Sequence, residues 1–179
     1  MNRFVLPLGI FALLAIVLAI GIKHSPDKGT IPSPLIGKAA PTFTLPVLND
    51  PNRTFSSADL KGRWYVFNVW GTWCGECRVE HSALLEISKR GEVPVIGLDW
   101  KDEDPTAIQW LTELGNPYEV VAVDREGRTA IDWGVYGAPE TFLVDPQGIV
   151  VYKFVGALTL DVWESKFVPK LPPRQAAKS

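Results

Sequence analysis

The two cysteines of the chain lie three residues apart, between an apolar segment and an amphipathic one. Cys74 and Cys77 are the only cysteines, and they closely follow residues 64–70, a nearly continuous apolar run. Such a run predicts a buried strand, and the spacing after it predicts a helix. The first sulfur would then lie at the helix N-terminus, where unpaired N–H groups stabilise a thiolate, and the second one turn later. This placement predicts a disulfide that opens and closes, as in thiol–disulfide exchange.

Two other uses of the cysteine pair fit the sequence less well. A structural zinc site needs four ligands, and Cys74, Cys77, His81 and the distant His24 provide one nearby ligand too few. We therefore expect no metal site. A purely structural disulfide would close a very short loop, so it would remove little entropy from the unfolded chain and add little stability.

The chain opens with an apolar segment, residues 4–22, that carries no charge. A helix of this length is just long enough to cross a bilayer core of about 30 Å. Arg3 precedes the segment, so the positive-inside rule places the leading end in the cytoplasm and the rest of the chain outside it. We expect a retained membrane anchor over residues 1–22; the alternative is a signal peptide cleaved after the small-residue stretch 19–21. Either way, the remaining chain is exported to a compartment where disulfides persist.

Composition divides the remaining chain into a linker, a domain and a tail. Residues 23–37 are rich in proline and predict an extended linker. Residues 38–170 are enough for one domain with a substantial core, and residues 171–179 predict a flexible tail. The formal net charge is −2, with both signs interspersed, so no basic stripe is present and nucleic acid is not an expected partner.

The periodicity of the predicted domain alternates between strand and helix. Strands are expected at residues 43–47, 53–55, 64–70, 93–98, 120–123, 140–144 and 149–154. Helices are expected at residues 76–90, 104–114, 129–133 and 160–167, with one helical turn at 56–60. This order predicts an α/β fold in which helices cover both faces of a mixed central sheet, with a β-hairpin at its N-terminal end.

Two helices have predictable ends or faces. In the helix after the cysteines, Val79, Leu84 and Ile87 are spaced for one buried face, and Gly91 is a stop signal. In the next helix, Asp104 is expected to be the N-cap, because proline at the following position favours the first helical turn.

Three segments resemble the CcmG or DsbE family, the membrane-anchored reductases of cytochrome c maturation. They are residues 68–74 (NVWGTWC), 77–81 (CRVEH) and 134–142 (GVYGAPETF). The resemblance runs from about residue 35 to residue 170 and also covers the N-terminal apolar segment. It implies a thioredoxin-like fold with a cis peptide bond before Pro139. One departure is the dipeptide Gly75-Glu76, because family members more often have a proline between the cysteines; the resemblance therefore does not fix the reduction potential.

The resemblance also implies a function, a location and partners. The protein would be a single-pass protein of the bacterial inner membrane whose catalytic domain reduces disulfides in the periplasm. Its substrate would be apocytochrome c or a thiol protein that handles apocytochrome c. A membrane electron conductor of the DsbD or CcdA type would return the cysteine pair of this protein to the reduced form. No cofactor beyond the redox-active cysteine pair is implied, and Arg78 follows Cys77 where a haem-attachment motif has histidine.

The resemblance adds five residues to the candidate site. Pro139, with Ala138, would line a groove that receives an extended substrate segment, beside Trp73. Glu80 lies one helical turn after the second cysteine, and Glu140 follows the proline. Carboxylates disfavour a nearby thiolate, so both are candidates for tuning the pair toward a weaker oxidant than DsbA, whose reduced form is stabilised.

Four further residues complete the expected chemistry. Cys74 is expected to be the exposed nucleophile, and Cys77 to resolve the mixed disulfide. Asn68 stands where thioredoxin has a buried aspartate that accepts a proton, so one of the glutamates is expected to take that role. His81 is expected to be an exposed helix residue; the alternative is that it acts as the base.

Three other functions stay open on the sequence. A general extracytoplasmic thiol reductase of the ResA or TlpA type shares the same motifs. A peroxidase of the peroxiredoxin type shares the fold but needs a single peroxidatic cysteine in a loop with proline and threonine. A copper-binding module would need wider cysteine spacing and a histidine within residues 134–142, where none occurs.

Overall fold

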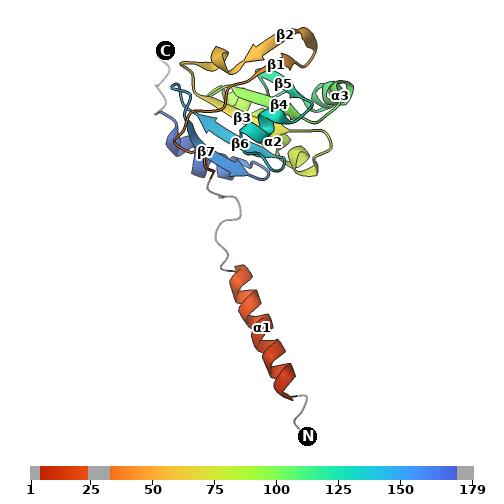
Figure 1. Cartoon of the computed structure of the whole chain (residues 1–179), viewed down its shortest axis with the longest axis vertical. Coiled ribbons are helices and arrows are strands. Elements are labelled where there is room, and N and C mark those ends of the chain that lie inside the picture. The colour runs from red at the N-terminus through yellow and green to blue at the C-terminus, as the bar shows by residue number, and fades with distance from the viewer. Residues whose placement is uncertain (1–4, 24–32, 173–179) are drawn as a thin grey trace. The chain divides into compact units, whose positions relative to one another are not determined.

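The computed structural model describes residues 5–23 and 33–172, which fall in two compact units, Met1–Thr30 and Ile31–Ser179. The described residues of the first unit form one helix, α1 (Val5–Lys23), of 19 residues (Figure 1). Among the residues described, no helix combines the length and the apolar character that crossing a membrane requires. Most of the predicted linker, residues 24–32, and most of the predicted tail, residues 173–179, lie outside the described residues.

The second unit is built on a seven-stranded sheet with the order β2-β1-β5-β4-β3-β6-β7 (Figure 1). The strands are β1 (Thr44–Val47), β2 (Asp50–Ser56), β3 (Tyr65–Trp70), β4 (Val95–Trp100), β5 (Val120–Asp124), β6 (Glu140–Val144) and β7 (Val150–Val155). Strands β3, β4 and β5 are parallel, and the other pairs are antiparallel. The predicted mixed sheet and its N-terminal hairpin are confirmed.

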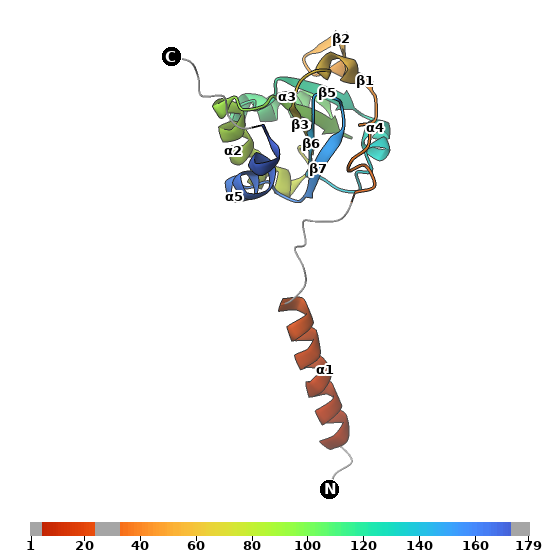
Figure 2. The same cartoon turned by 90° about the vertical axis from the view of Figure 1, so that its left-hand side faces the viewer.

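Helices cover both faces of this sheet, as predicted (Figure 2). They are η1 (Ser57–Leu60), α2 (Gly75–Arg90), α3 (Asp104–Leu114), α4 (Arg128–Asp132), α5 (Leu160–Val162), η2 (Trp163–Phe167) and η3 (Val168–Lys170). Helices α2, α3 and α5 pack on one face, and α4 and η1 on the other. The helix predicted over residues 160–167 is divided: α5 continues as the π-helical turn η2, whose rings Trp163 and Phe167 stack in the core.

Local signals set most of the helix ends. Ser56 and Asp59 form the capping box of η1, and Gly91 ends α2 in the left-handed conformation, both where the sequence predicts an end. The predicted N-cap of α3 is wrong by one residue. Glu103 is the N-cap, and Asp104 is the first helical residue, from which its carboxylate pairs with Arg125 on another loop.

The buried face of α2 differs from the prediction. Leu84 and Ile87 are buried as expected, but Val79 is 63% exposed. The buried stripe runs through Cys77 and Glu80 to Leu84 and Ile87, at intervals of three and four residues. A polar residue therefore occupies a core position, and a pattern that counts only apolar residues selects Val79 instead.

Strand register brings the site segments to one end of the sheet. Trp70 at the end of β3 pairs with Asp99 near the end of the parallel strand β4. Glu140 at the start of the antiparallel strand β6 pairs with Val69. The carboxyl ends of β3 and β4 therefore meet the start of β6, and the chain leaves β3 there to enter α2 through Cys74.

Candidate active site

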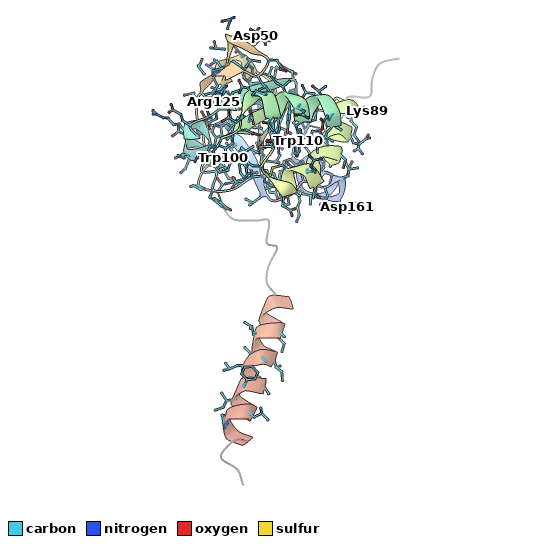
Figure 3. The ribbon with its side chains drawn as sticks, turned by 90° about the vertical axis from the view of Figure 1, so that its right-hand side faces the viewer. Asp50, Lys89, Trp100, Trp110, Arg125 and Asp161 are labelled. Carbon is cyan, nitrogen blue, oxygen red and sulfur yellow. A yellow bond between two sulfur atoms is a disulfide. The ribbon has the colours of Figure 1, made fainter. Side chains whose placement is uncertain are left out.

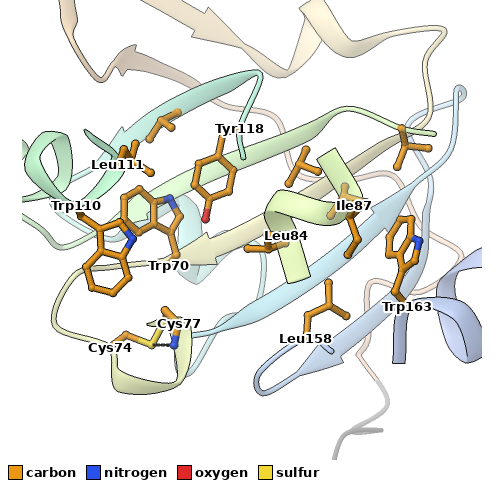
Figure 4. Close-up of a cluster of buried hydrophobic side chains, with 14 of the residues drawn as sticks. Trp70, Cys74, Cys77, Leu84, Ile87, Trp110, Leu111, Tyr118, Leu158 and Trp163 are labelled. Carbon is orange, nitrogen blue, oxygen red and sulfur yellow. Dashed lines mark hydrogen bonds between the residues drawn. A yellow bond between two sulfur atoms is a disulfide. The ribbon is translucent and has the colours of Figure 1, made fainter. Parts of the chain in front are cut away.

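The cysteine pair forms a disulfide at the start of α2. Cys74 and Cys77 are bonded with their Cα atoms 5.3 Å apart. Cys74 is the N-cap, and its Sγ accepts a hydrogen bond of 3.1 Å from the Cys77 N–H (Figure 4). The predicted position at the helix N-terminus is confirmed. Unpaired N–H groups at this end favour a negative charge on the first sulfur.

The predicted exposure of Cys74 is wrong for this disulfide form. Cys74 is 5% exposed and Cys77 is 2% exposed, because both belong to an apolar cluster with Trp70, against which Ala138 packs. Solvent exposure hardly separates the two sulfurs. What separates them is position, since only Cys74 caps the helix.

The loop before the cysteines is fixed by contacts with the β4–α3 loop. A Cβ on Gly71 would lie 2.5 Å from the Trp73 Nε1, so glycine at this position leaves room for the Trp73 ring. The Trp73 indole is 53% exposed, donates to the Trp100 carbonyl at 3.0 Å and meets the Trp100 ring edge-on (Figure 3 labels Trp100). Thr72 donates through its N–H and its hydroxyl to the Asp102 carboxylate. These contacts hold the residues that precede the reactive sulfur.

The predicted cis peptide bond is present between Ala138 and Pro139. Ala138 packs against the same apolar cluster as the two cysteines. The Pro139 carbonyl accepts from the Gly156 N–H at 3.0 Å, which ties this loop to the end of β7. The structure therefore brings the proline loop to the end of the sheet where the disulfide lies.

Glu80 is buried one turn after Cys77. Its Oε1 accepts from the Asn68 Nδ2 at 2.8 Å, and its Oε2 accepts from the Leu158 N–H at 2.8 Å. Burial raises the pKa of Glu80 to about 8, although both hydrogen bonds favour the charged form and oppose that rise. The side chain can therefore take up or release a proton near neutral pH.

Asn68 forms hydrogen bonds with three buried side chains, those of Glu80, Thr141 and Tyr118. Its Nδ2 donates to Glu80 and, at 3.1 Å, to the Thr141 hydroxyl, while its Oδ1 accepts from the Tyr118 hydroxyl at 2.9 Å. Both amide hydrogens and the amide oxygen are thus used. Asn68 was identified from the sequence, but Tyr118 and Thr141 were not, because their contacts join residues far apart in the chain.

Glu140 is buried and paired with a lysine. Its Oε2 lies 2.8 Å from the Lys153 Nζ, and its Oε1 accepts from the Tyr136 N–H at 3.3 Å. The same Nζ donates to the Gly134 carbonyl at 2.9 Å. Burial raises the pKa of Glu140, and the lysine opposes that rise. The negative charge is therefore balanced locally. Lys153 was not identified as a site residue from the sequence, although a lysine inside an apolar strand itself indicates a buried partner of opposite charge.

His81 is buried, and the prediction of an exposed helix residue is wrong. Helix α3 packs over this part of α2, so the His81 ring meets the Trp110 ring edge-on. Its Nε2 lies 3.0 Å from the Gly115 carbonyl, and its Nδ1 accepts from the Trp110 Nε1 at 3.4 Å. Burial lowers the pKa of His81. Both ring nitrogens are engaged, so no lone pair is free to take a proton from a thiol.

Asp99 is a third buried carboxyl group of this region, and it was not predicted from the sequence. It lies near the end of β4, beside the reactive loop. Burial, followed by the nearby negative charges of Asp102 and Asp104, raises its pKa to about 8. Across the part of the chain that is described, no three His, Cys, Asp or Glu side chains are grouped as metal ligands would be.

The comparisons with known proteins agree with this geometry. A family model described as Redoxin matches residues 35–167. The thiol:disulfide interchange protein DsbE of Allochromatium vinosum is 46% identical over 177 residues, which cover 99% of this chain and 97% of that protein. The DsbE of Pseudomonas aeruginosa is 47% identical over 164 residues, which cover 92% of this chain and 89% of that protein.

Solved structures show the same relationship. A crystal structure assigned to DsbE of Chlorobium tepidum matches with a TM-score of 0.66 at 26% identity, over 76% of this chain and 98% of that one. The relatives match almost end to end, and the Cys74–Cys77 disulfide lies at the start of α2 in a thioredoxin-like sheet. The chain therefore belongs to the DsbE family of thiol:disulfide interchange proteins, within the Redoxin family, and is a thiol:disulfide oxidoreductase.

Proposed function

We propose that this protein is an extracytoplasmic reductant of apocytochrome c, or of a thiol protein that handles it, during cytochrome c maturation. The observation that carries the proposal is the buried Glu80, one turn after Cys77, in a disulfide site that caps a helix. The likeness to DsbE proteins supports the same assignment. The cysteine pair needs no further cofactor for this reaction.

The reaction proceeds in two exchange steps. The Cys74 thiolate attacks one sulfur of the substrate disulfide; the substrate S–S bond breaks, its other sulfur leaves and takes up a proton, and a mixed disulfide forms. Cys77 then loses its proton and attacks the Cys74 sulfur, which releases the second substrate sulfur. Two electrons pass to the substrate, and the protein is left with the Cys74–Cys77 disulfide.

Glu80 takes the proton from Cys77 in the second step. The two side chains lie on the same buried stripe of α2. The pKa of Glu80, about 8, is close to the ordinary pKa of a thiol, about 8.5, so a proton passes between them at small cost in free energy. Asn68, which has no ionisable group, acts as a donor to Glu80 and not as an acceptor of this proton.

The charges around the site favour a reductant. The helix N-terminus stabilises the Cys74 thiolate, which alone would make the disulfide more oxidising. A carboxylate beside the sulfurs acts in the opposite direction. Since Lys153 balances the charge of Glu140, we assign this tuning mainly to Glu80, which exerts it in its charged form and therefore most strongly above its pKa of about 8. The result is a weaker oxidant than DsbA.

Substrate binds where the proline loop and the reactive loop meet. We assign Trp73, Ala138 and Pro139 to the walls of this site. The exposed Trp73 indole supplies apolar and aromatic surface, and Ala138 packs against the apolar cluster that contains both cysteines. An extended substrate segment laid along the loop before β6 would present its disulfide to Cys74.

A membrane anchor and an electron donor complete the proposal. The uncharged residues 4–22 behind Arg3 would hold the protein in the bacterial inner membrane as a single span, with the domain in the periplasm. A membrane electron conductor of the DsbD or CcdA type would return the pair to its dithiol form. Protease added to spheroplasts should digest the domain, and the intact protein should sediment with membranes. A soluble protein that begins near residue 22 would contradict the anchor.

The substrate can be identified with a trapping variant. Cys77→Ser leaves Cys74 able to form the mixed disulfide but removes the resolving sulfur, so the captured partner stays attached. Cells that express Cys77→Ser are quenched with acid, and the disulfide-linked partners are identified by mass spectrometry. Capture of apocytochrome c or of a cytochrome c maturation protein supports the proposal. The matched control, Cys74→Ser, should capture neither.

A general extracytoplasmic thiol reductase is the second candidate, since it would use the same cysteine pair and the same fold. The trap separates the two functions. If Cys77→Ser captures many unrelated exported proteins and no cytochrome c or maturation protein, the general reductase is the better assignment.

A further inference from the structure

Tyr118 is a buried tyrosine whose hydroxyl has no part in the mechanism above. Its ring stacks on the Trp70 ring, with centroids 5.4 Å apart and planes 19° apart. A Cβ on Gly97 would lie 2.9 Å from the Tyr118 Cγ and 2.9 Å from the Trp70 Nε1, so glycine in β4 makes room for both rings. The Tyr118 N–H donates to the Asn116 Oδ1 at 2.9 Å. These contacts therefore hold the Tyr118 ring in one position.

In this position the Tyr118 hydroxyl points at Asn68. Figure 4 shows the Tyr118 hydroxyl pointing into the space between Trp70 and Leu84, above β3. It donates to the Asn68 Oδ1 at 2.9 Å. The Oδ1 side of the amide thus faces Tyr118, and the Nδ2 side faces Glu80 and Thr141. Burial, followed by the charges of Glu80 and Asp99, raises the pKa of Tyr118 well above its ordinary value, so the hydroxyl remains a donor at neutral pH.

The orientation of the amide decides which form of Glu80 is stabilised. With Nδ2 toward Glu80, the amide donates to the carboxylate and favours the charged form. With the amide turned over, Oδ1 would face Glu80 and could only accept a hydrogen bond, which favours the protonated form. In that orientation the Tyr118 hydrogen would lose the Asn68 acceptor, and burying an unpaired hydroxyl is unfavourable.

We propose that Tyr118 is a positioning residue: its hydroxyl fixes the Asn68 amide with Nδ2 toward Glu80 and thereby keeps the charged, proton-accepting form of Glu80 accessible. The inference rests on the proposed function for the use of Glu80 in exchange, but the placement of the amide stands without it. The titratable groups that face the network are Glu80 on α2, Tyr118 itself and Asp99 on β4. Cys77 does not titrate in the disulfide form.

The test is the titration of Glu80 in Tyr118→Phe. This variant keeps the ring, and so its stacking on Trp70, but removes the hydrogen bond to Asn68. The full-length oxidised protein, in detergent micelles and labelled with ¹³C at the glutamate side-chain carboxyls, is titrated by NMR. The Glu80 signal is assigned by its loss in Glu80→Gln, and aspartates such as Asp99 carry no label. We expect the Glu80 midpoint to rise by about one pH unit, a roughly tenfold weaker acid.

Two comparisons separate positioning from general destabilisation. Tyr65→Phe removes the hydroxyl of another buried tyrosine, at the opposite end of β3, and should leave the Glu80 midpoint unchanged. In the background of Asn68→Leu, which has no amide to orient, Tyr118→Phe should have no further effect. An unchanged midpoint in Tyr118→Phe, or an equal shift in Tyr65→Phe, would overturn the proposal. Additive shifts with Asn68→Leu would also overturn it, because Tyr118 would then act on Glu80 directly. If Asn68→Leu does not fold, the two tyrosine variants decide.

The rate of exchange distinguishes this inference from the proposed function. If Tyr118→Phe moves the Glu80 midpoint and Glu80→Gln leaves the pH profile of disulfide exchange unchanged, Tyr118 positions the amide, but Glu80 does not accept the proton of Cys77. If Glu80→Gln changes the pH profile and Tyr118→Phe moves neither the midpoint nor the profile, the proposed function stands and the positioning role is wrong.

Discussion

Glu80 should make the stability of the folded protein depend on pH, and Glu80→Gln should remove that dependence. The pKa of Glu80 is about 8 in the folded protein and near its ordinary value of 4.5 when the chain unfolds. Between these values the folded state binds one more proton than the unfolded state. Stability therefore falls as pH rises through this window, by about 1.4 kcal/mol per pH unit. The contribution of the neutral carboxyl is fully present below about pH 4.5 and is lost above about pH 8.

From pH 5.5 to pH 7.5, this group alone should cost the wild type about 2.5 kcal/mol of unfolding free energy. The assay is urea unfolding at intervals of half a pH unit. The protein is kept oxidised, because cysteines in a disulfide do not titrate. Asp99 titrates in the same range but is present in both proteins, so it cancels in the difference. The matched control is Glu86→Gln, a solvent-accessible glutamate on the same helix, which should keep the wild-type slope. Parallel slopes for wild type and Glu80→Gln would refute the assignment of a raised pKa to Glu80.

Two further predictions concern stability. Lys153→Met should lower the unfolding free energy by about 3–5 kcal/mol, because it leaves the Glu140 carboxylate buried without its partner. The double variant with Glu140→Gln should recover most of this loss. Additive losses of the two variants in urea unfolding would contradict the buried pair. Val79→Ser should change the unfolding free energy by no more than about 0.5 kcal/mol, whereas Leu84→Ala on the buried face of the same helix should lower it by about 2–5 kcal/mol. Similar losses of unfolding free energy in both variants would show that Val79 is buried.

The fold was predictable because its main signals are local. Every residue of β3 is buried, and such a strand reads as a nearly continuous apolar run, which Asn68 interrupts here. Gly91 ends α2 because it adopts a left-handed conformation, which glycine permits at low cost. Cys74 could be placed at the helix N-terminus because a strand, a short loop and a helix follow one another in the chain. Each of these features depends on neighbours within a few residues.

The interior of the site was not predictable, because its partners are distant in sequence. Tyr118 and Asn68 are 50 residues apart, and Leu158 and Glu80 are 78 residues apart. A glutamate is counted as a surface residue until such partners are known, so the buried stripe of α2 was assigned to Val79. The same reasoning placed His81 at the surface, although α3 covers it.

The central claim is that Cys74 delivers electrons from the reduced pair to a protein disulfide. The direct measurement uses reduced Cys77→Ser and an oxidised peptide that carries a C-x-x-C-H motif, quenched with acid and analysed by mass spectrometry. We expect the peptide attached to Cys74, and we expect reduced wild-type protein to convert the same peptide to its dithiol while forming the Cys74–Cys77 disulfide. A peptide that stays oxidised with the reduced wild type, or that is captured by Cys74→Ser and not by Cys77→Ser, would contradict the account.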